Sequence, residues 1–158
     1  MYDTLSPTNQ LTNLAKLYMK KVNFYWIYIL ECKNDSYYTG YTENLGKRYY
    51  QHVTGTGSAK FTRSFKPDHI AQAWRLFGSK GDALRIEKMI KDQDRKTKVF
   101  LVKYPERLKE MADREFDSDF ELYTFNPHLV EWEALNLSKK DIRKNKNPYS
   151  DAPPGHIT

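Results

Sequence analysis

Residues 37–52 of this 158-residue chain read YYTGYTENLGKRYYQH, and the fold is decided within and around this stretch. Its first six residues are aromatic and β-branched around one glycine, which favours a strand. Asn44 follows, and an asparagine in this position can cap a helix, here predicted over residues 45–53. Upstream, residues 24–30 read FYWIYIL, an uninterrupted apolar run of strand length. The turn residues KNDS at 33–36 join the two strands as a β-hairpin.

Further from this hairpin the chain shows weaker signals. A loop rich in lysine, arginine and phenylalanine runs through Pro67 and precedes a predicted third strand at residues 70–77. Asp82 can cap a helix over residues 83–93, and a short helix follows through Val102. We therefore divide the chain into a leader with one short helix (1–23), a domain (24–103), an acidic and aromatic, mostly helical extension (104–138) and a basic, proline-containing tail (139–158).

The composition excludes several classes of protein. Aromatic residues make up 15% of the chain, whereas disordered chains lack them. No apolar run approaches the roughly 20 residues that span a bilayer, and the N-terminus lacks the basic-then-apolar pattern of a secretion signal. A single cysteine, Cys32, excludes an intrachain disulfide and a zinc site built from cysteines. These features predict a cytoplasmic protein without membrane contact.

Charge is unevenly distributed along the chain, whose formal net charge is +6. Residues 33–103 carry 15 basic and 7 acidic side chains, whereas residues 104–135 carry 3 basic and 9 acidic ones. A basic block interleaved with aromatic residues suggests a polyanionic partner, nucleic acid first, although a solvated basic surface gives the same pattern. The acidic block either packs over the basic face or completes the core as a helical extension, and it is a candidate contact for a partner protein.

Two predicted helices carry charged side chains in informative places. In the helix after Asp82, Glu87 falls inside the apolar arc, where a carboxylate is costly unless it is paired or holds a metal ion. A salt bridge and oxygen ligation of Mg²⁺ or Mn²⁺ are both open interpretations.

In the preceding helix, Arg48 and His52 lie four residues apart and are neighbours. They form either one edge of a phosphate-binding site or an ordinary surface pair.

The predicted hairpin holds several tyrosines, and their placement depends on its turn. A four-residue turn puts Tyr28 and Tyr38 on opposite faces of the sheet, whereas one residue more or fewer puts them on the same face. Strand tyrosines are ordinarily packing residues, so none of them indicates catalysis by itself.

In order and spacing, these segments resemble the GIY-YIG endonuclease domain. The matching motifs are Trp26-Ile27-Tyr28, Tyr38-Thr39-Gly40, NLGKR at 44–48, His52 and ALRIE at 83–87. The stretch at 37–52 and the loop GTGSAKFTRSFKP are similar to the small, stand-alone branch of the family, and the resemblance covers about residues 24–102. It implies an α+β fold, with a three-stranded antiparallel sheet flanked by helices, and metal-dependent cleavage of phosphodiester bonds.

The resemblance also implies a role for each candidate site residue. Tyr28 is the general base or its relay, Tyr38 positions the attacking water or the phosphate, and Arg48 neutralises charge on the phosphoryl oxygens. His52 binds a tyrosine hydroxyl or helps to take a proton. Glu87 holds a single divalent ion, Mg²⁺ or Mn²⁺.

The basic loop is the expected DNA-facing element. The expected DNA contacts are Lys47, Lys60, Thr62, Arg63 and Lys66. Phe61 and Phe65 in the same loop either stack on an exposed base or anchor the loop to the core. The predicted function is a DNA endonuclease of low sequence specificity that acts on branched, nicked or distorted DNA, in repair, recombination or DNA degradation. A non-catalytic nucleic-acid-binding module and a DNA-degrading toxin are the alternatives.

Overall fold

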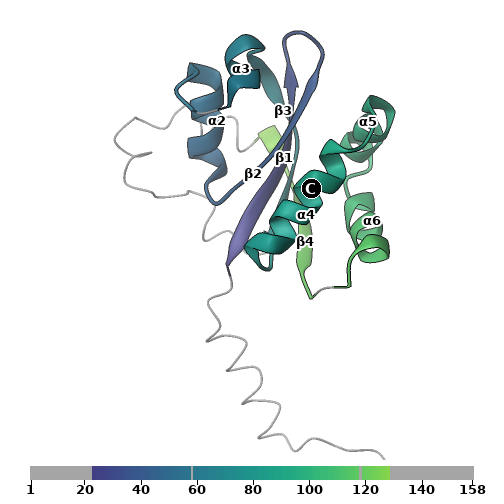
Figure 1. The fold of residues 1–158 in the computed structure, drawn as a ribbon. Coiled ribbons are helices and arrows are strands. Elements are labelled where there is room, and N and C mark those ends of the chain that lie inside the picture. Colours follow the sequence, from purple (N-terminus) through teal and green to yellow (C-terminus); the bar gives the residue numbers. More distant parts are fainter. Residues whose placement is uncertain (1–22, 58, 118, 129–158) are drawn as a thin grey trace, which may run out of the picture.

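The computed structural model describes residues 23–57, 59–117 and 119–128. The predicted leader helix and the segment 129–158 lie outside this part of the chain. In chain order the elements are β1 (Phe24–Cys32), β2 (Tyr37–Thr42), α2 (Leu45–Thr54), α3 (Lys60–Ser64), β3 (Pro67–Phe77), α4 (Lys80–Lys91), α5 (Arg95–Lys103), α6 (Arg107–Glu115) and β4 (Glu121–Phe125). In Figure 1 the hairpin of β1 and β2 lies between α2 on the left and α4, α5 and α6 on the right.

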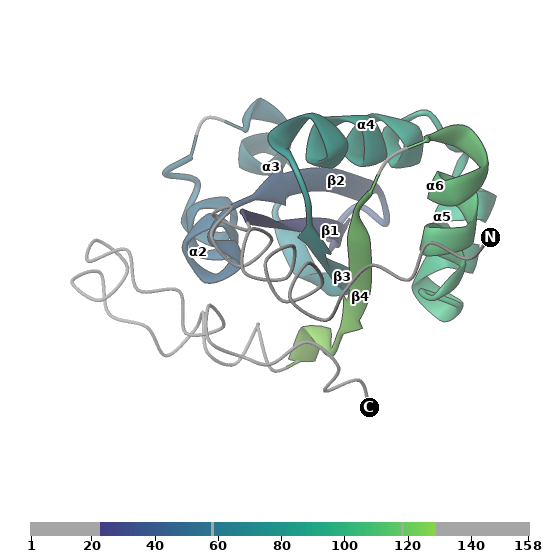
Figure 2. The ribbon, with the colours of Figure 1, turned by 90° about the horizontal axis from the view of Figure 1, so that it is seen from below.

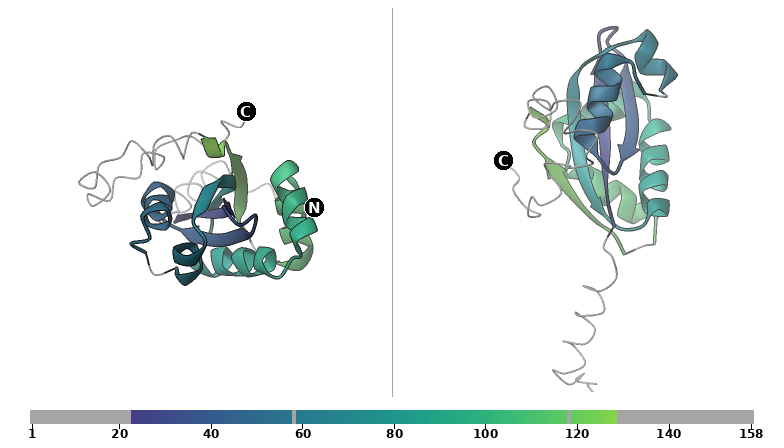
Figure 3. Two further views of the ribbon diagram at one scale, coloured as in Figure 1. Left: turned by 90° about the horizontal axis from the view of Figure 1, so that it is seen from above. Right: turned by 90° about the vertical axis from the view of Figure 1, so that its left-hand side faces the viewer.

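The strands form one antiparallel sheet in the order β2-β1-β3-β4. The α+β class, the hairpin and the flanking helices are confirmed, but the sheet has a fourth strand, so the C-terminal extension contributes more than helices. Residues 121–125 pair with β3, from Ala73↔Phe125 to Phe77↔Glu121. Their strand conformation depends on the edge of β3, a contact between distant parts of the chain that local composition does not signal. The right-hand view of Figure 3 shows β4 on the side of the molecule away from α4.

The turn of the hairpin places Tyr28 and Tyr38 on the same face of the sheet. The register pairs Tyr28 with Gly40 and Leu30 with Tyr38. The connection between the last paired residues therefore has five residues, 32–36, one more than the turn that would separate the two tyrosines. Because residues two apart along a strand share a face, both tyrosines project toward the same side.

Each face of the sheet has its own core. The odd-numbered residues of β1 from 25 to 29 pack with α4, α5 and α6. Leu108 and Ala112 of α6 and Phe120 before β4 belong to the same cluster, so this part of the acidic extension completes a core. The even-numbered residues from 26 to 30 pack with Leu45 and Tyr49 of α2. Figure 2 shows α4 lying along the sheet, with α5 and α6 beside each other at its end.

The N-caps fix where the two helices nearest the candidate site begin. Asn44 caps α2 as predicted, and its Oδ1 accepts a hydrogen bond from the Lys47 amide at 2.9 Å. Helix α4 begins earlier than predicted because Ser79 is its N-cap, and Asp82 completes a capping box with that serine. The basic loop contains a short helix, α3. Within the described residues, none of the helices is both long enough and apolar enough to cross a membrane.

Candidate active site

A buried tyrosine–histidine pair joins β1 to α2. Tyr28 is 1% exposed, and its Oη lies 2.8 Å from Nε2 of His52. On the other side of the imidazole, Nδ1 lies 2.7 Å from Oγ1 of Thr62. His52 and Thr62 are as buried as the tyrosine, so the three polar side chains form a hydrogen-bonded chain away from solvent. A bond to a tyrosine hydroxyl is one of the two roles that the family resemblance implied for His52.

Burial and charge act on both members of this pair. Burial is the main cause that raises the pKa of Tyr28 above its usual range, and the neighbouring Tyr38 adds to this effect. Arg48 acts in the opposite direction and lowers this pKa. Burial and the positive charge of Arg48 lower the pKa of His52 to about 4. The histidine is therefore neutral near pH 7, and a neutral imidazole keeps one nitrogen free to accept a proton. The pair can hold or move a proton along the bond between them.

Arg48 projects from α2 toward both tyrosine hydroxyls. Burial acts to lower its pKa, but the hydroxyls of Tyr28 and Tyr38 outweigh this effect and raise it. One guanidinium nitrogen, Nη1, donates a hydrogen bond to Oε1 of Gln51 at 3.3 Å. The guanidinium stays charged and has further donors, and its planar fork suits the oxygens of a phosphate.

Tyr38 begins a row of aromatic rings that leads from the site to the surface. Its ring centroid lies 5.0 Å from that of the His52 imidazole, and it stacks on Phe61 at 6.0 Å. Phe61 in turn contacts Phe65 at a centroid distance of 5.1 Å. These two phenylalanines are 38% and 41% exposed. The row therefore anchors α3 to the site and also presents apolar surface to solvent.

Glu87 lies on α4, which packs against β1 and β2, and it forms an ion pair. Its Oε1 lies 3.0 Å from Nζ of Lys91, and the glutamate side chain is 14% exposed. The salt bridge, one of the two interpretations from sequence, is therefore present. Burial is the main cause of the raised pKa of Tyr28, and the charge of Glu87 adds to it, which places this carboxylate within electrostatic reach of the tyrosine.

A metal ion at this site would have few protein ligands. No group of three His, Cys, Asp or Glu side chains suited to a metal ion occurs within the described ranges. The partly exposed carboxylate of Glu87 nevertheless fits Mg²⁺ or Mn²⁺. Ions of the Mg²⁺ type usually keep several waters and bind through one or two carboxylates and substrate phosphate. The donor set thus agrees with a single ion shared between protein, water and substrate.

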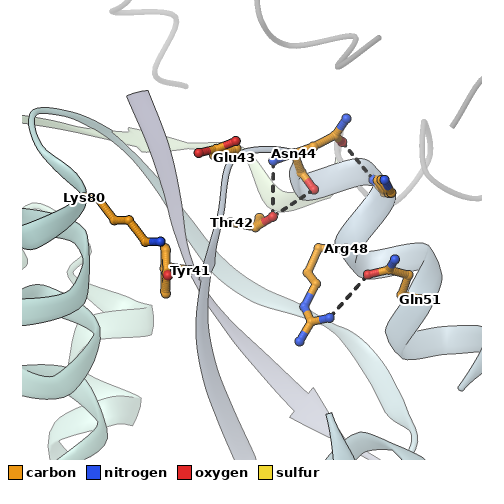
Figure 4. Close-up of a pocket in the computed structure, with 8 residues that line it drawn as sticks. Tyr41, Thr42, Glu43, Asn44, Arg48, Gln51 and Lys80 are labelled. Carbon is orange, nitrogen blue, oxygen red and sulfur yellow. Dashed lines mark hydrogen bonds between the residues drawn. The ribbon is translucent and has the colours of Figure 1, made fainter. Parts of the chain in front are cut away.

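A cavity of about 510 Å³ opens beside Arg48, between α2 and the start of α4 (Figure 4). Its lining is mostly polar and includes the cations Lys47, Arg48 and Lys80. In Figure 4, Arg48 lies on one side of β2 and Lys80 on the other, reaching toward Tyr41. Lys80 is not among the site residues predicted from the sequence. It lies seven residues before Glu87, so the two share a side of α4, and this helical spacing is the signal that could have found it.

The predicted DNA contacts are not equally placed. Lys60 and Arg63 are exposed on α3, Lys66 is half-buried just after it, and Lys47 lines the cavity. Thr62 differs, because its side chain is buried and bonds His52. The turn of α3 directs this residue inward while its neighbours at 61 and 63 are exposed. In this structure, Thr62 faces the protein interior and is not a surface contact.

Comparison with known proteins identifies the domain that carries this site. The family model described as the GIY-YIG catalytic domain matches residues 24–100. The chain is 42% identical over 78 residues to the UPF0213 protein BH0048 of Halalkalibacterium halodurans. The aligned stretch covers 49% of this chain and 81% of the relative. It is 39% identical over 83 residues to the UPF0213 protein OB0043 of Oceanobacillus iheyensis, with 52% and 94% covered.

A solved structure gives a further comparison. The solution NMR structure of the UPF0213 protein BH0048 from Bacillus halodurans is 39% identical, covers 51% of this chain and 84% of that chain, and has a TM-score of 0.33.

The sequence matches run over most of each relative, and the domain model that matches is that of a nuclease family. The chain therefore belongs to the GIY-YIG nuclease domain family, together with the UPF0213 proteins.

Proposed function

We propose that this protein is a divalent-metal-dependent endonuclease that hydrolyses DNA phosphodiester bonds. The observation that carries the proposal is the buried bond between Tyr28 and His52 beside the charged Arg48, in a chain of a nuclease family. Each group has a use in phosphodiester hydrolysis. The pair accepts a proton from the attacking water, the guanidinium binds the phosphoryl oxygens, and Glu87 supplies a carboxylate for a metal ion.

Tyr28 and His52 act together as the base. The Oη of Tyr28 takes a proton from the attacking water as its own proton passes to Nε2 of His52, across a distance of 2.8 Å. The water oxygen forms the new bond to phosphorus, the bond from phosphorus to the leaving oxygen breaks, and the imidazole becomes imidazolium. A neutral histidine is required at the start, and burial and Arg48 favour this state because they lower the pKa of His52 to about 4. Because burial and Arg48 lower the pKa of His52, the imidazolium also loses its proton readily after the reaction.

The remaining groups bind and orient the phosphate. Arg48 contacts the phosphoryl oxygens, on which negative charge increases in the transition state. Tyr38, whose ring lies beside the imidazole, positions the water or the phosphate. Glu87 would hold a single Mg²⁺ or Mn²⁺ ion, which supplies Lewis-acid polarisation of the phosphate and stabilises the leaving oxygen. Lys91 pairs with the Glu87 carboxylate and competes with the metal ion for it.

The cations around the site mark a path for the DNA backbone. Lys47 and Lys80 line the cavity beside Arg48, and Lys60, Arg63 and Lys66 lie on and after α3. Contacts to phosphates position the protein but carry no sequence information, so we expect low sequence specificity. Phe61 and Phe65 can stack on an exposed base, which favours branched, nicked or distorted DNA. Such selectivity suits a role in repair, recombination or DNA degradation.

Replacing Arg48 with alanine is expected to reduce cleavage by about 10²–10³-fold, the loss typical when one donor to a developing charge is removed. DNA binding should change little, because the other cations remain. The assay follows cleavage of labelled duplex, single-stranded and branched DNA in Mg²⁺, in Mn²⁺ and in EDTA, with binding recorded in parallel. Arg107→Ala is the matched control, since Arg107 lies half exposed on α6 in an ion pair with Glu110. Binding without cleavage by the unaltered protein, on every substrate and with either metal, contradicts the proposal and favours the binding module.

Removing two cations of α3 should weaken DNA binding without changing the chemical step. We expect the double variant Lys60→Ala, Arg63→Ala to reduce the slope of log K against log salt concentration by about 2, one for each lost phosphate contact. Cleavage on saturating DNA should stay close to the wild-type rate. The double variant Arg107→Ala, Lys109→Ala on α6 removes the same charge and should leave the slope unchanged. Equal slopes for wild type and the α3 variant would show that DNA does not contact this helix.

A further inference from the structure

Thr62 is the inner end of a hydrogen-bonded chain that reaches Tyr28 through His52. Its Oγ1 lies 2.7 Å from Nδ1 of His52, and Nε2 of the same ring lies 2.8 Å from the Tyr28 hydroxyl. All three side chains are almost completely buried, at 1% exposure each. Neither ring nitrogen is therefore left to solvent, and the tautomer of His52 is set by its two protein partners.

The hydrogen bonds of Thr62 show which ring nitrogen of His52 carries the proton. The Thr62 hydroxyl donates to the carbonyl oxygen of Ala59, at 3.3 Å. A hydroxyl has a single proton, so its oxygen acts as an acceptor toward His52. The proton of the neutral imidazole therefore lies on Nδ1.

The hydrogen bonds of Tyr28 independently give the same assignment of the His52 proton. Among the described residues, the side chains that form hydrogen bonds with the Tyr28 hydroxyl are His52 and Arg48. An arginine has donors only, so Nε2 of His52 is the acceptor for the tyrosine proton. Because a neutral imidazole carries one proton, both ends require the same tautomer, with Nδ1 protonated and Nε2 free.

We infer that Thr62 is a positioning residue that holds His52 in this tautomer, with the free Nε2 turned toward Tyr28. The catalytic consequence rests on the proposed function: only this tautomer can take the proton that Tyr28 releases when Tyr28 deprotonates the attacking water. With the other tautomer, Nε2 already carries a proton and donates to the tyrosine oxygen, so the transfer is blocked. The threonine thus acts on the reaction through the histidine, without contact to the substrate.

A purely structural role for Thr62 is the competing interpretation, because its bond to His52 also ties α3 to α2. Two substitutions separate the roles. Thr62→Val keeps the shape of the side chain and removes the acceptor, whereas Thr62→Ser keeps the acceptor and removes a methyl group. A packing role predicts that serine is at least as harmful as valine, and a tautomer-fixing role predicts that only valine is harmful.

The tautomer can be measured without DNA or metal. The full chain is labelled with ¹⁵N at histidine, and long-range ¹H–¹⁵N correlation spectra report which nitrogen of each ring carries the proton. His52→Gln assigns the His52 signals among the four histidines of the chain. His69 is the internal control, because it lies partly exposed beside Asp68 and Glu31 on β1 and β3 and its signals should not change.

We expect wild type and Thr62→Ser to show a protonated Nδ1 and a free Nε2, and Thr62→Val to show averaged signals from both tautomers. A proton on Nε2 in the wild type overturns the inference, and so does a Thr62→Val spectrum identical to that of the wild type. Thr62→Ala serves as the second acceptor-free variant if valine prevents folding, with circular dichroism as the check, and the wild-type spectrum is decisive even without either variant.

Cleavage then tests the consequence for catalysis. Thr62→Val should cleave DNA about 10–100-fold more slowly, by analogy with the loss when the hydrogen-bond partner of a metal-ligating histidine is removed, and Thr62→Ser should stay close to wild type. DNA binding should be equal in all three proteins. A changed tautomer with wild-type cleavage would overturn the positioning role. If the wild type shows the expected tautomer but cleaves no DNA, the proposed function is wrong. The assignment of the proton to Nδ1 of His52 would then still stand.

Discussion

Glu87→Gln is expected to lower metal-dependent cleavage by about 10³-fold or more, because Lewis-acid stabilisation by a bound ion contributes several kcal/mol and each 1.36 kcal/mol is tenfold in rate. The amide keeps the size of the side chain and removes the negative charge that a hard cation requires of its protein ligand. The measurement is the single-turnover cleavage rate in Mg²⁺ and in Mn²⁺, with EDTA as the blank. Mn²⁺ binding is followed in parallel by titration calorimetry, and binding of DNA in EDTA should be unchanged.

The ion pair of Glu87 with Lys91 requires its own control. Loss of the carboxylate also leaves Lys91 without its partner at 3.0 Å, so a purely structural ion pair could explain a defect. Lys91→Gln removes the pair and keeps the carboxylate, and we expect it to cleave DNA and to bind Mn²⁺ at least as tightly as wild type, because a competing cation is gone. Glu110→Gln on α6 is the control for charge alone. Equal defects in Glu87→Gln and Lys91→Gln would show that the pair, and no metal, is what the site needs.

The parts of the fold that could be predicted from sequence are those with local signals. The run FYWIYIL and the stretch that contains Asn44 specify β1, β2 and α2, because a buried strand and a capped helix are both visible within about ten residues. The predicted start of α4 is too late, since Ser79 and Asp82 both have the chemistry of an N-cap and the structure uses both in one capping box. Choosing between them requires knowledge of where β3 ends.

The parts that could not be predicted depend on contacts between distant residues. Strand β4 is a five-residue segment in an acidic context, and it becomes a strand by pairing with β3, about fifty positions earlier in the chain. Thr62 looks like a surface residue because its neighbours are basic, and only the docking of α3 against α2 buries it. Whether Tyr28 and Tyr38 share a face depended on a single residue in the hairpin turn.

The candidate site shows the same division. Its members on β1, β2 and α2 are close in sequence, and the structure brings Tyr28, Tyr38, Arg48 and His52 into mutual reach. The roles that the resemblance implies for them are still predictions that the variants above test. Glu87 comes from a distant helix, and its position inside an apolar arc signalled a partner without saying which one. The structure shows a lysine as that partner.

Gly40→Ala is the second substitution with a large expected effect, and it acts through Tyr28. Gly40 pairs with Tyr28 in the hairpin register, so a side chain there points at the tyrosine ring. A Cβ at residue 40 would overlap the tyrosine hydroxyl and lie 2.6 Å from Cζ, closer than real Cβ contacts occur. The strands cannot separate without breaking their ladder, and the ring is enclosed at 1% exposure, so the ring must leave its position. The small residue at this position therefore makes room for the tyrosine hydroxyl beside His52.

We expect Gly40→Ala to cleave DNA about 10²–10⁴-fold more slowly, the range for loss of a general base, and to unfold at a lower temperature, as overpacking typically costs about 1–3 kcal/mol. DNA binding should persist, because the cations of the cavity and of α3 are untouched. Gly81→Ala is the matched control: of the residues that the structure describes, a Cβ there meets only the Ser79 hydroxyl, at 3.5 Å in the first turn of α4, so cleavage and stability should be retained. Thermal unfolding by circular dichroism accompanies each cleavage assay.

A double-mutant cycle decides whether the effect of Gly40→Ala passes through the tyrosine. Tyr28→Phe removes the hydroxyl that bonds His52 and should by itself slow cleavage by about 10²–10⁴-fold. If the alanine acts by displacing this hydroxyl, the double variant should cleave no more slowly than the slower single variant, because the same interaction cannot be lost twice. Additive losses would mean that residue 40 affects the site by another route. Near-wild-type cleavage by Gly40→Ala would show that the tyrosine hydroxyl is not needed where the structure places it, and the base assigned to this site would then be wrong.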